Sequence, residues 1–190
     1  MQHVRMRRAG LVLVVGLLAI VGVACRSGGP QTHEDRVSAM ESALRSGSES
    51  ERRSALDSLY ELGAESIPVV KPLLSSPDPE LRRRAIWVLS NAGDEAFRPL
   101  AQAALYDKDE NVRYDAVLAL GASWDQPRQV IPVLRKALMD PDRWVRVAAI
   151  ESLRAVGDPS VLAELETLTR DEDRLVRSAA ISAIETLRVE

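Results

Sequence analysis

Apolar and polar residues in this chain follow a helical pattern that returns about every 30 residues. In each period an arginine is followed by alanine three residues later, by an aliphatic residue after four and by leucine or isoleucine after seven. Positions with these spacings lie on one face of an α-helix, so the pattern predicts a repeated helix with one buried face. The anchor arginines, separated by 30, 31, 33 and 31 residues, are Arg52, Arg82, Arg113, Arg146 and Arg177.

A second apolar segment precedes each anchor from the second period onward. Pro68, Pro99 and Pro132 each stand fourteen residues before an anchor. Proline is tolerated in the first turn of a helix, where an N–H group would have no helical partner. Each period is therefore expected to hold two helices joined by a turn. The first helices are predicted over Ile67–Leu74, Pro99–Leu105, Val130–Leu138 and Val161–Leu168.

Turn residues recur at fixed distances from the anchors. Gly63, Gly93 and Gly157 stand eleven residues after an anchor, where the C-terminus of a helix favours glycine. The third period has Trp124 at this position, and the longest spacing follows, which indicates a small insertion over residues 123–126. Four residues before the anchors, aspartates are suited to the N-cap of the second helix, and Ser48 replaces them in the first period. These aspartates are Asp78, Asp109, Asp142 and Asp173.

A repeat of this length is typical of stacked units that bury their apolar faces only against their neighbours. The expected fold is all-α, a right-handed α-solenoid of about five helix-turn-helix units over residues 33–190, with a degenerate first unit as a cap. The string from Asp109 to Arg113, with alanine, leucine and glycine at the offsets above, resembles HEAT-like repeats of the short kind found in phycobilisome lyases. This resemblance covers roughly residues 33–188.

The resemblance implies a polar ladder between adjacent units, formed by aspartate and arginine, with a role in stacking. On this chain the ladder would consist of Asp78 with Arg82, Asp109 with Arg113, Asp142 with Arg146 and Asp173 with Arg177. The resemblance also implies an alternative function, that of an accessory factor or enzyme acting on a bound ligand, as in bilin lyases. Export of the chain would separate it from cytoplasmic phycobiliproteins and so weighs against a bilin lyase.

The first 24 residues are predicted to be a secretory signal. Three arginines precede an apolar run from Leu11 to Ala24, and this run is short for a helix that crosses a membrane. Cys25 is the only cysteine in the chain and directly follows Val23 and Ala24, as in a bacterial lipobox, although Gly22 stands where leucine is usual. We expect Cys25 to be the lipid-attachment site and residues 25–32 to form a flexible tether. The alternatives are an uncleaved signal anchor and a plain signal peptide.

The charge balance excludes some partners. Without residues 1–24 the chain has 22 basic and 28 acidic residues, a formal net charge of −6. We therefore expect no nucleic-acid binding and no membrane contact except through the N-terminal lipid. The expected location is the bacterial cell envelope, with the repeat domain outside the cytoplasm on the inner or outer membrane.

Residues suited to catalysis or metal binding are scarce. Of the two histidines, His3 lies in the predicted signal, and His33 with Glu34 would supply one ligand pair where a metal site needs three or four ligands. A serine nucleophile would lack a histidine base. We therefore predict no catalytic residues, no metal and no cofactor, and a protein that is not an enzyme.

The side of the second helices opposite the buried face carries apolar residues where a charged solenoid should be polar. If these helices line a concave groove, the residues would bind a partner, since aromatic residues and arginine are frequent in binding hot spots. Alternatively, Trp87 and Trp144 complete the core. The predicted function is a non-enzymatic interaction scaffold, monomeric or weakly oligomeric, that binds a protein or peptide. The predicted groove residues are Arg83, Trp87, Tyr114, Leu118, Trp144, Val147 and Leu175.

Overall fold

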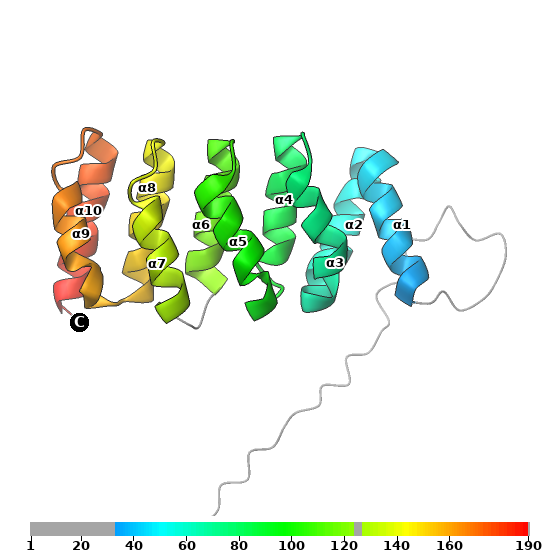
Figure 1. The fold of residues 1–190 in the computed structure, drawn as a ribbon, viewed down its shortest axis with the longest axis horizontal. Helices are drawn as coiled ribbons and strands as arrows, with labels where there is room; N and C mark the ends of the chain where they lie inside the picture. Colours follow the sequence, from blue (N-terminus) through cyan, green and yellow to red (C-terminus); the bar gives the residue numbers. More distant parts are fainter. Residues whose placement is uncertain (1–32, 124–126, 190) are drawn as a thin grey trace, which may run out of the picture.

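The computed structural model describes residues 33–123 and 127–189, which form helical hairpins standing in a row along the long axis of the molecule (Figure 1). This part of the chain contains no strand, so the predicted all-α solenoid is confirmed. The first helices of the hairpins are α1 (His33–Ser46), α3 (Ile67–Val70), α5 (Phe97–Tyr106), α7 (Pro127–Ala137) and α9 (Leu162–Leu168). The second helices are α2 (Glu49–Leu62), α4 (Pro79–Leu89), α6 (Glu110–Ser123), α8 (Arg143–Val156) and α10 (Arg174–Val189).

The two sets of helices form two layers, and each second helix packs against the second helix of the next unit. Short 3₁₀ segments connect or extend the helices. They are η2 (Gly63–Ser66), η3 (Lys71–Ser75), η4 (Asp94–Ala96) and η5 (Pro159–Val161). A single apolar core runs through all the units and lies between the layers.

The predicted buried face of the second helices forms much of this core. The alanines three residues after the anchors are at most 3 % exposed, which lets neighbouring helices approach closely. The aliphatic residues one position further on are at most 5 % exposed in the first four units, whereas Ile181 in α10 is 47 % exposed. This position therefore faces the following unit, and no described unit follows α10.

The predicted N-caps are present. The side chains of Asp78, Asp109, Asp142 and Asp173 each accept a hydrogen bond from a backbone N–H in the first turn of the second helix. Ser48 accepts from the N–H of Glu51, whose carboxylate accepts from the N–H of Ser48. This reciprocal pair is a capping box, which fixes the start of α2 in the degenerate first unit.

Two of the predicted first helices differ from the structure. The segment Ile67–Leu74 is not one helix, because Pro72 has no N–H to donate and the chain continues from α3 as the 3₁₀ segment η3. Pro132 does not lie in a first turn but inside α7, which already begins at Pro127. The predicted insertion near Trp124 lies mostly outside the described residues, and α6 continues past Gly121 to Ser123.

Glycine is required for different reasons at two positions. Gly157 ends α8 with φ of 74° and ψ of 16°, the left-handed conformation that side chains disfavour. Gly121 allows α6 and α8 to approach each other. A Cβ atom at Gly121 would overlap the Oγ and Cβ atoms of Ser152 and lie 3.0 Å from its Cα.

Candidate functional site

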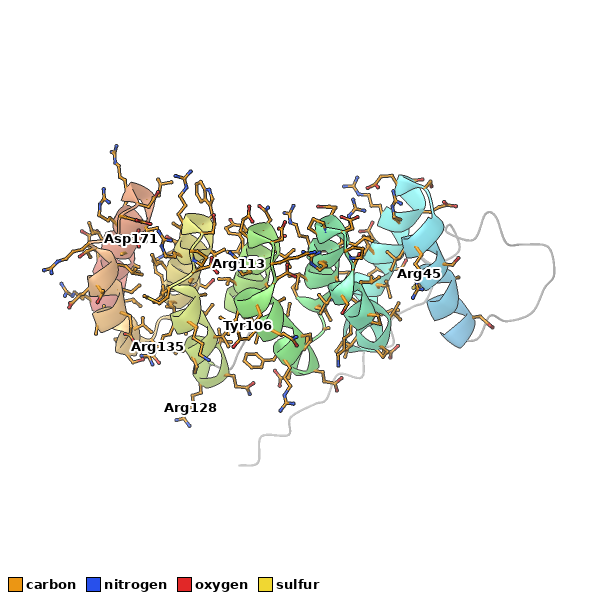
Figure 2. The ribbon with its side chains drawn as sticks, turned by 45° about the horizontal axis from the view of Figure 1, so that its top comes forward. Arg45, Tyr106, Arg113, Arg128, Arg135 and Asp171 are labelled. Atoms are coloured by element: carbon orange, nitrogen blue, oxygen red, sulfur yellow. The ribbon has the colours of Figure 1, made fainter. Side chains whose placement is uncertain are left out.

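The turns between the paired helices carry a continuous polar ladder. Arg82 of α4 donates hydrogen bonds from Nε and Nη2 to the two carboxylate oxygens of Asp107 in the next unit, both at 2.9 Å. Arg113 binds Asp140 in the same two-pronged way, at 2.8 and 2.9 Å. Arg146 continues the series with one hydrogen bond of 2.9 Å to Asp171. Figure 2 shows Arg113 and Asp171 in the same row along the upper part of the array.

Each ladder aspartate also belongs to the turn of its own unit. Asp140 accepts a hydrogen bond from the backbone N–H of Asp142, and its carbonyl oxygen accepts one from Nη1 of Arg146. Asp107 makes the same contacts with Asp109 and Arg113. Each arginine thus holds the turn of its own unit through carbonyl oxygens and the turn of the next unit through a carboxylate. The ladder therefore links the turns of four successive units.

The ladder differs from the one that the resemblance implied. Asp78, Asp109, Asp142 and Asp173 are N-caps and do not form the arginine–carboxylate rungs. The carboxylates of the rungs come from Asp107, Asp140 and Asp171, two residues before a cap aspartate. The cap side chains accept from the N–H groups of their own helices, and among the four Asp173 also pairs with Arg143 of the preceding unit. The guanidinium of Arg177 donates only to the carbonyl oxygens of Asp171 and Glu172 among the described residues.

The ladder sets the protonation of its groups. Burial raises the pKa of the Asp107 carboxyl, but the hydrogen bonds from Arg82 and from the N–H of Asp109 outweigh it, and the pKa lies below its usual value. The hydrogen bond to Asp140 raises the pKa of Arg113 above its usual range. Both groups are therefore charged near neutral pH. The lowered pKa of Asp107 and the raised pKa of Arg113 result from the contacts that hold neighbouring units together.

The predicted groove residues occupy one side of the second helices and remain partly open to solvent. Trp87, Leu118, Trp144 and Leu175 are 46, 37, 48 and 45 % exposed. We call these four residues, together with the half-buried Tyr114 and Val147, the apolar stripe. Neither tryptophan is in the core, and both present about half of their surface to solvent.

The apolar stripe crosses the helices diagonally. Trp87 lies near the C-terminal end of α4, Tyr114 and Leu118 lie in the middle part of α6, and Trp144 and Leu175 lie in the first turns of α8 and α10. A partner that follows the stripe would therefore cross the second helices at an angle.

Charged residues beside the stripe are paired with one another. Arg83, predicted as a groove residue, donates from Nε to Asp115 of α6 at 2.6 Å and also lies 3.4 Å from Glu80. Arg143 lies 3.2 Å from Asp173, and its guanidinium carbon is 5.4 Å from the ring centre of Trp144. The stripe is thus bordered by ion pairs, and what it offers a partner is apolar surface.

One aromatic residue of this surface was not among the predicted groove residues. Tyr60 of α2 stacks on Trp87 of α4, with ring centres 4.4 Å apart and ring planes inclined by 16°. Tyr60 stands eight residues after Arg52, an offset that points to the same side of the second helix. This offset could have identified it, although its contact with Trp87 depends on how the first two units stack.

The predicted signal, Cys25 and the tether lie outside the described residues. Within residues 33–123 and 127–189 no helix has the length and apolar character needed to cross a membrane. The same part of the chain has no group of three or more histidine, cysteine, aspartate or glutamate residues arranged to hold a metal ion. His33 is the first residue of α1.

Comparison with known proteins assigns the repeat. The profile of the family described as HEAT repeats matches residues 37–104 and 97–185. The chain belongs to the HEAT-repeat family. This HEAT-repeat protein is 29 % identical over 127 residues to an uncharacterized phycocyanin operon protein Z from Pseudanabaena tenuis (strain PCC 7409). The match covers 64 % of this chain and 63 % of that relative, so the chain spans less than two thirds of the relative's length.

Solved structures with the same architecture include natural and designed proteins. The complex of CpcE and CpcF of phycocyanin lyase from Nostoc sp. PCC7120 contains a chain with a TM-score of 0.63 and 21 % identity. The match covers 77 % of this HEAT-repeat chain and 96 % of that one. A designed armadillo repeat protein in complex with the peptide (KR)4 has a TM-score of 0.52 and 18 % identity, with coverage of 81 and 82 %. At these identities the likeness concerns the fold, which resembles that of phycobilisome lyase subunits.

Proposed function

We propose that this HEAT-repeat protein is a non-enzymatic scaffold that binds a protein or peptide partner along the apolar stripe. The observation that carries the proposal is the exposure of Trp87, Leu118, Trp144 and Leu175 on four successive second helices. Exposed apolar patches bordered by charge are typical of interaction sites, and tryptophan and tyrosine are frequent in binding hot spots. Packing of one repeat unit against the next does not account for the exposure of these side chains, because such packing would bury them.

The carboxyl groups with shifted pKa values serve the helix caps and the ion pairs of the stack. Among the described carboxyl groups whose pKa is clearly shifted, every pKa is lowered, through hydrogen bonds to N-terminal turns or to arginine. These groups belong to Glu49, Glu51, Asp107, Asp158 and Asp173.

The test of this function is recovery of a partner from cell-envelope extracts with two matched variants. Trp87→Ser/Trp144→Ser removes the two largest side chains of the stripe. Met139→Ser/Ile181→Ser removes two side chains that are 79 and 47 % exposed and lie outside the stripe, in the turn after α7 and on α10. A protein recovered with the unchanged chain should be lost with the first variant and retained with the second. Equal recovery with both variants contradicts a role for the stripe.

Anchoring to the cell envelope through Cys25 is part of the proposed function. The support is the position of this single cysteine after a basic start and an apolar run. A lipidated Cys25 would hold the solenoid outside the cytoplasm by the tether of residues 25–32. The full-length chain expressed in a bacterium should then enter the detergent phase, and Cys25→Ser should abolish this. An unchanged partition and mass of the variant would contradict lipidation.

A second candidate is an accessory factor or enzyme that acts on a bound ligand. It is favoured by the names of two similar proteins, a phycocyanin operon protein and a phycocyanin lyase complex. The two candidates differ in the expected response to a bilin. A shift of the bilin absorption band on addition of the chain favours the second candidate, and an unchanged spectrum favours the scaffold.

A further inference from the structure

A cleft of about 660 Å³ lies between the first-helix segments of the second and third units. One wall is η3 with the turn that follows it, and the other is α5 with the turn from Tyr106 to Lys108. The volume is within the range of small-molecule sites, which is roughly 300–1,000 Å³. The apolar stripe lies on the second helices, so the cleft is a separate feature of the molecule.

Positive charge dominates the lining of this cleft. Its cations are Lys71, Arg82, Arg98 and Lys108, and its one carboxylate is that of Asp107. Arg82 and Asp107 neutralise each other in the first rung of the ladder. Lys71, Arg98 and Lys108 form no ion pair with a described carboxylate, although the charge of Lys108 favours the ionised form of Asp107. The cleft thus gathers three positive charges in excess, in a chain whose formal net charge is −3.

The other units show that stacking does not require these cations. The positions equivalent to Arg98, fifteen residues before an anchor, hold Ile67, Ile131 and Leu162. The positions equivalent to Lys108 hold Pro77, Pro141 and Glu172.

The position equivalent to Lys71 holds arginine in only one other unit, and that arginine is engaged. Arg135 lies 2.8 Å from Glu164 and donates to the carbonyl oxygen of Ser160. Among the described units, cations without a described carboxylate partner occupy all three positions only at the junction between the second and third units.

From this arrangement we infer that the cleft binds an anionic small molecule that carries phosphate groups. Lysine and arginine both bind phosphate oxygens, arginine through its planar fork and lysine as a point charge. The cleft is larger than a single phosphate needs, and Leu74, Pro99 and the exposed ring of Tyr106 provide apolar surface for the rest of the ligand. The ligand class is therefore a phosphorylated organic molecule, and the two possible sources of the phosphate are a soluble metabolite and a lipid headgroup.

The test is isothermal titration calorimetry at low salt. Pyrophosphate is the soluble probe, and the protein is the tag-free chain without residues 1–24. The site variant is Lys71→Gln/Arg98→Gln. The matched control is Arg128→Gln/Lys136→Gln, which removes one arginine and one lysine from exposed positions on α7 outside the cleft. Saturable binding that weakens at least tenfold in the site variant and less than twofold in the control supports the inference.

Other outcomes overturn it. One is the absence of saturable binding at pyrophosphate concentrations up to about 1 mM. A dissociation constant above this value would be weak for a charged ligand. An equal loss in both variants would show a general effect of net charge. Vesicles containing phosphatidylglycerol provide the second arm. Binding to these vesicles without saturable binding of pyrophosphate would show a surface attracted to membranes and contradict a small-molecule cleft.

Discussion

Arg113 donates from Nε and Nη2 to the two carboxylate oxygens of Asp140, at 2.8 and 2.9 Å, across 27 residues of sequence and the boundary between two repeats. The two side chains are only 12 and 7 % exposed, so solvent screens the pair weakly. Because the carbonyl oxygen of Asp140 also accepts from Arg146, the pair is one link in a chain of contacts through the turns. Stacking in this solenoid therefore depends on directed polar contacts in addition to apolar burial.

Arg113→Gln should destabilise the protein strongly. The substitution leaves the buried Asp140 carboxylate without its counter-ion, a loss that costs about 3 kcal/mol or more in comparable buried pairs. Arg177→Gln is the matched control, since Arg177 binds the carbonyl oxygens of its own turn but no described carboxylate. The control should lose about 1 kcal/mol, as expected for ordinary hydrogen bonds. Urea denaturation measures both values, and equal losses would contradict the role of the rung.

Stability should fall in acid because of the first rung. The pKa of Asp107 is lower in the folded chain than the unfolded value near 4, so its contribution to stability is complete above that value. The contribution is lost as the pH falls through the folded pKa, because the protonated carboxyl group no longer attracts Arg82. Urea denaturation at pH values from 7 to 3 should show this loss. In Asp107→Asn the decline should be smaller, and an identical decline would show that other carboxylates account for it.

Gly121→Ala should destabilise the contact between α6 and α8. The added Cβ overlaps the side chain of Ser152, and overpacking of this kind costs about 1–3 kcal/mol. Adding Ser152→Gly removes the overlapping atoms, so Gly121→Ala should cost less in a Ser152→Gly background than in the unchanged chain. Thermal unfolding monitored by circular dichroism measures both costs. An equal cost in the two backgrounds would show that the overlap does not cause the loss.

The two tryptophans of the stripe should contribute little to folding. Trp144→Ser removes a side chain that already has 48 % of its surface exposed, so the loss of stability should stay near 0.5 kcal/mol. Trp87→Ser should cost about 0.5–1.5 kcal/mol more, because it also removes the stacking contact with Tyr60. Losses of about 3–5 kcal/mol for each variant, as for buried aromatic residues, would place these side chains in the core.

The helices, their caps and the buried face could be predicted from the sequence because they depend on short offsets within one repeat. Asp109 and Ala116 are examples, as both roles follow from distance to Arg113. The partner of Arg113 could not be assigned in this way, since it depends on the relative height of two units. The recurrence of aspartate six residues before three anchors was the available signal, and it points to Asp107, Asp140 and Asp171.

The surface residues could be predicted only in part, because some of their contacts depend on two units. The offsets placed Trp87 and Trp144 on the outer side of the second helices, and both are about half exposed. The offsets did not show that Arg83 is held by Asp115 of the next unit, or that Tyr60 stacks on Trp87. The cleft beside Lys71 and Arg98 also depends on two units, so no motif within one repeat reveals it.

The most direct test of the scaffold is a photo-cross-link from the middle of the stripe in the native cell. Leu118→p-benzoylphenylalanine places the reactive group on α6 at a position that is already 37 % exposed, and Met139→p-benzoylphenylalanine is the control on the turn after α7. We expect a discrete adduct from position 118, absent from position 139 and lost when Trp87→Ser and Trp144→Ser are added. The same adducts from both positions, or an adduct that survives the two serine substitutions, would contradict a binding stripe.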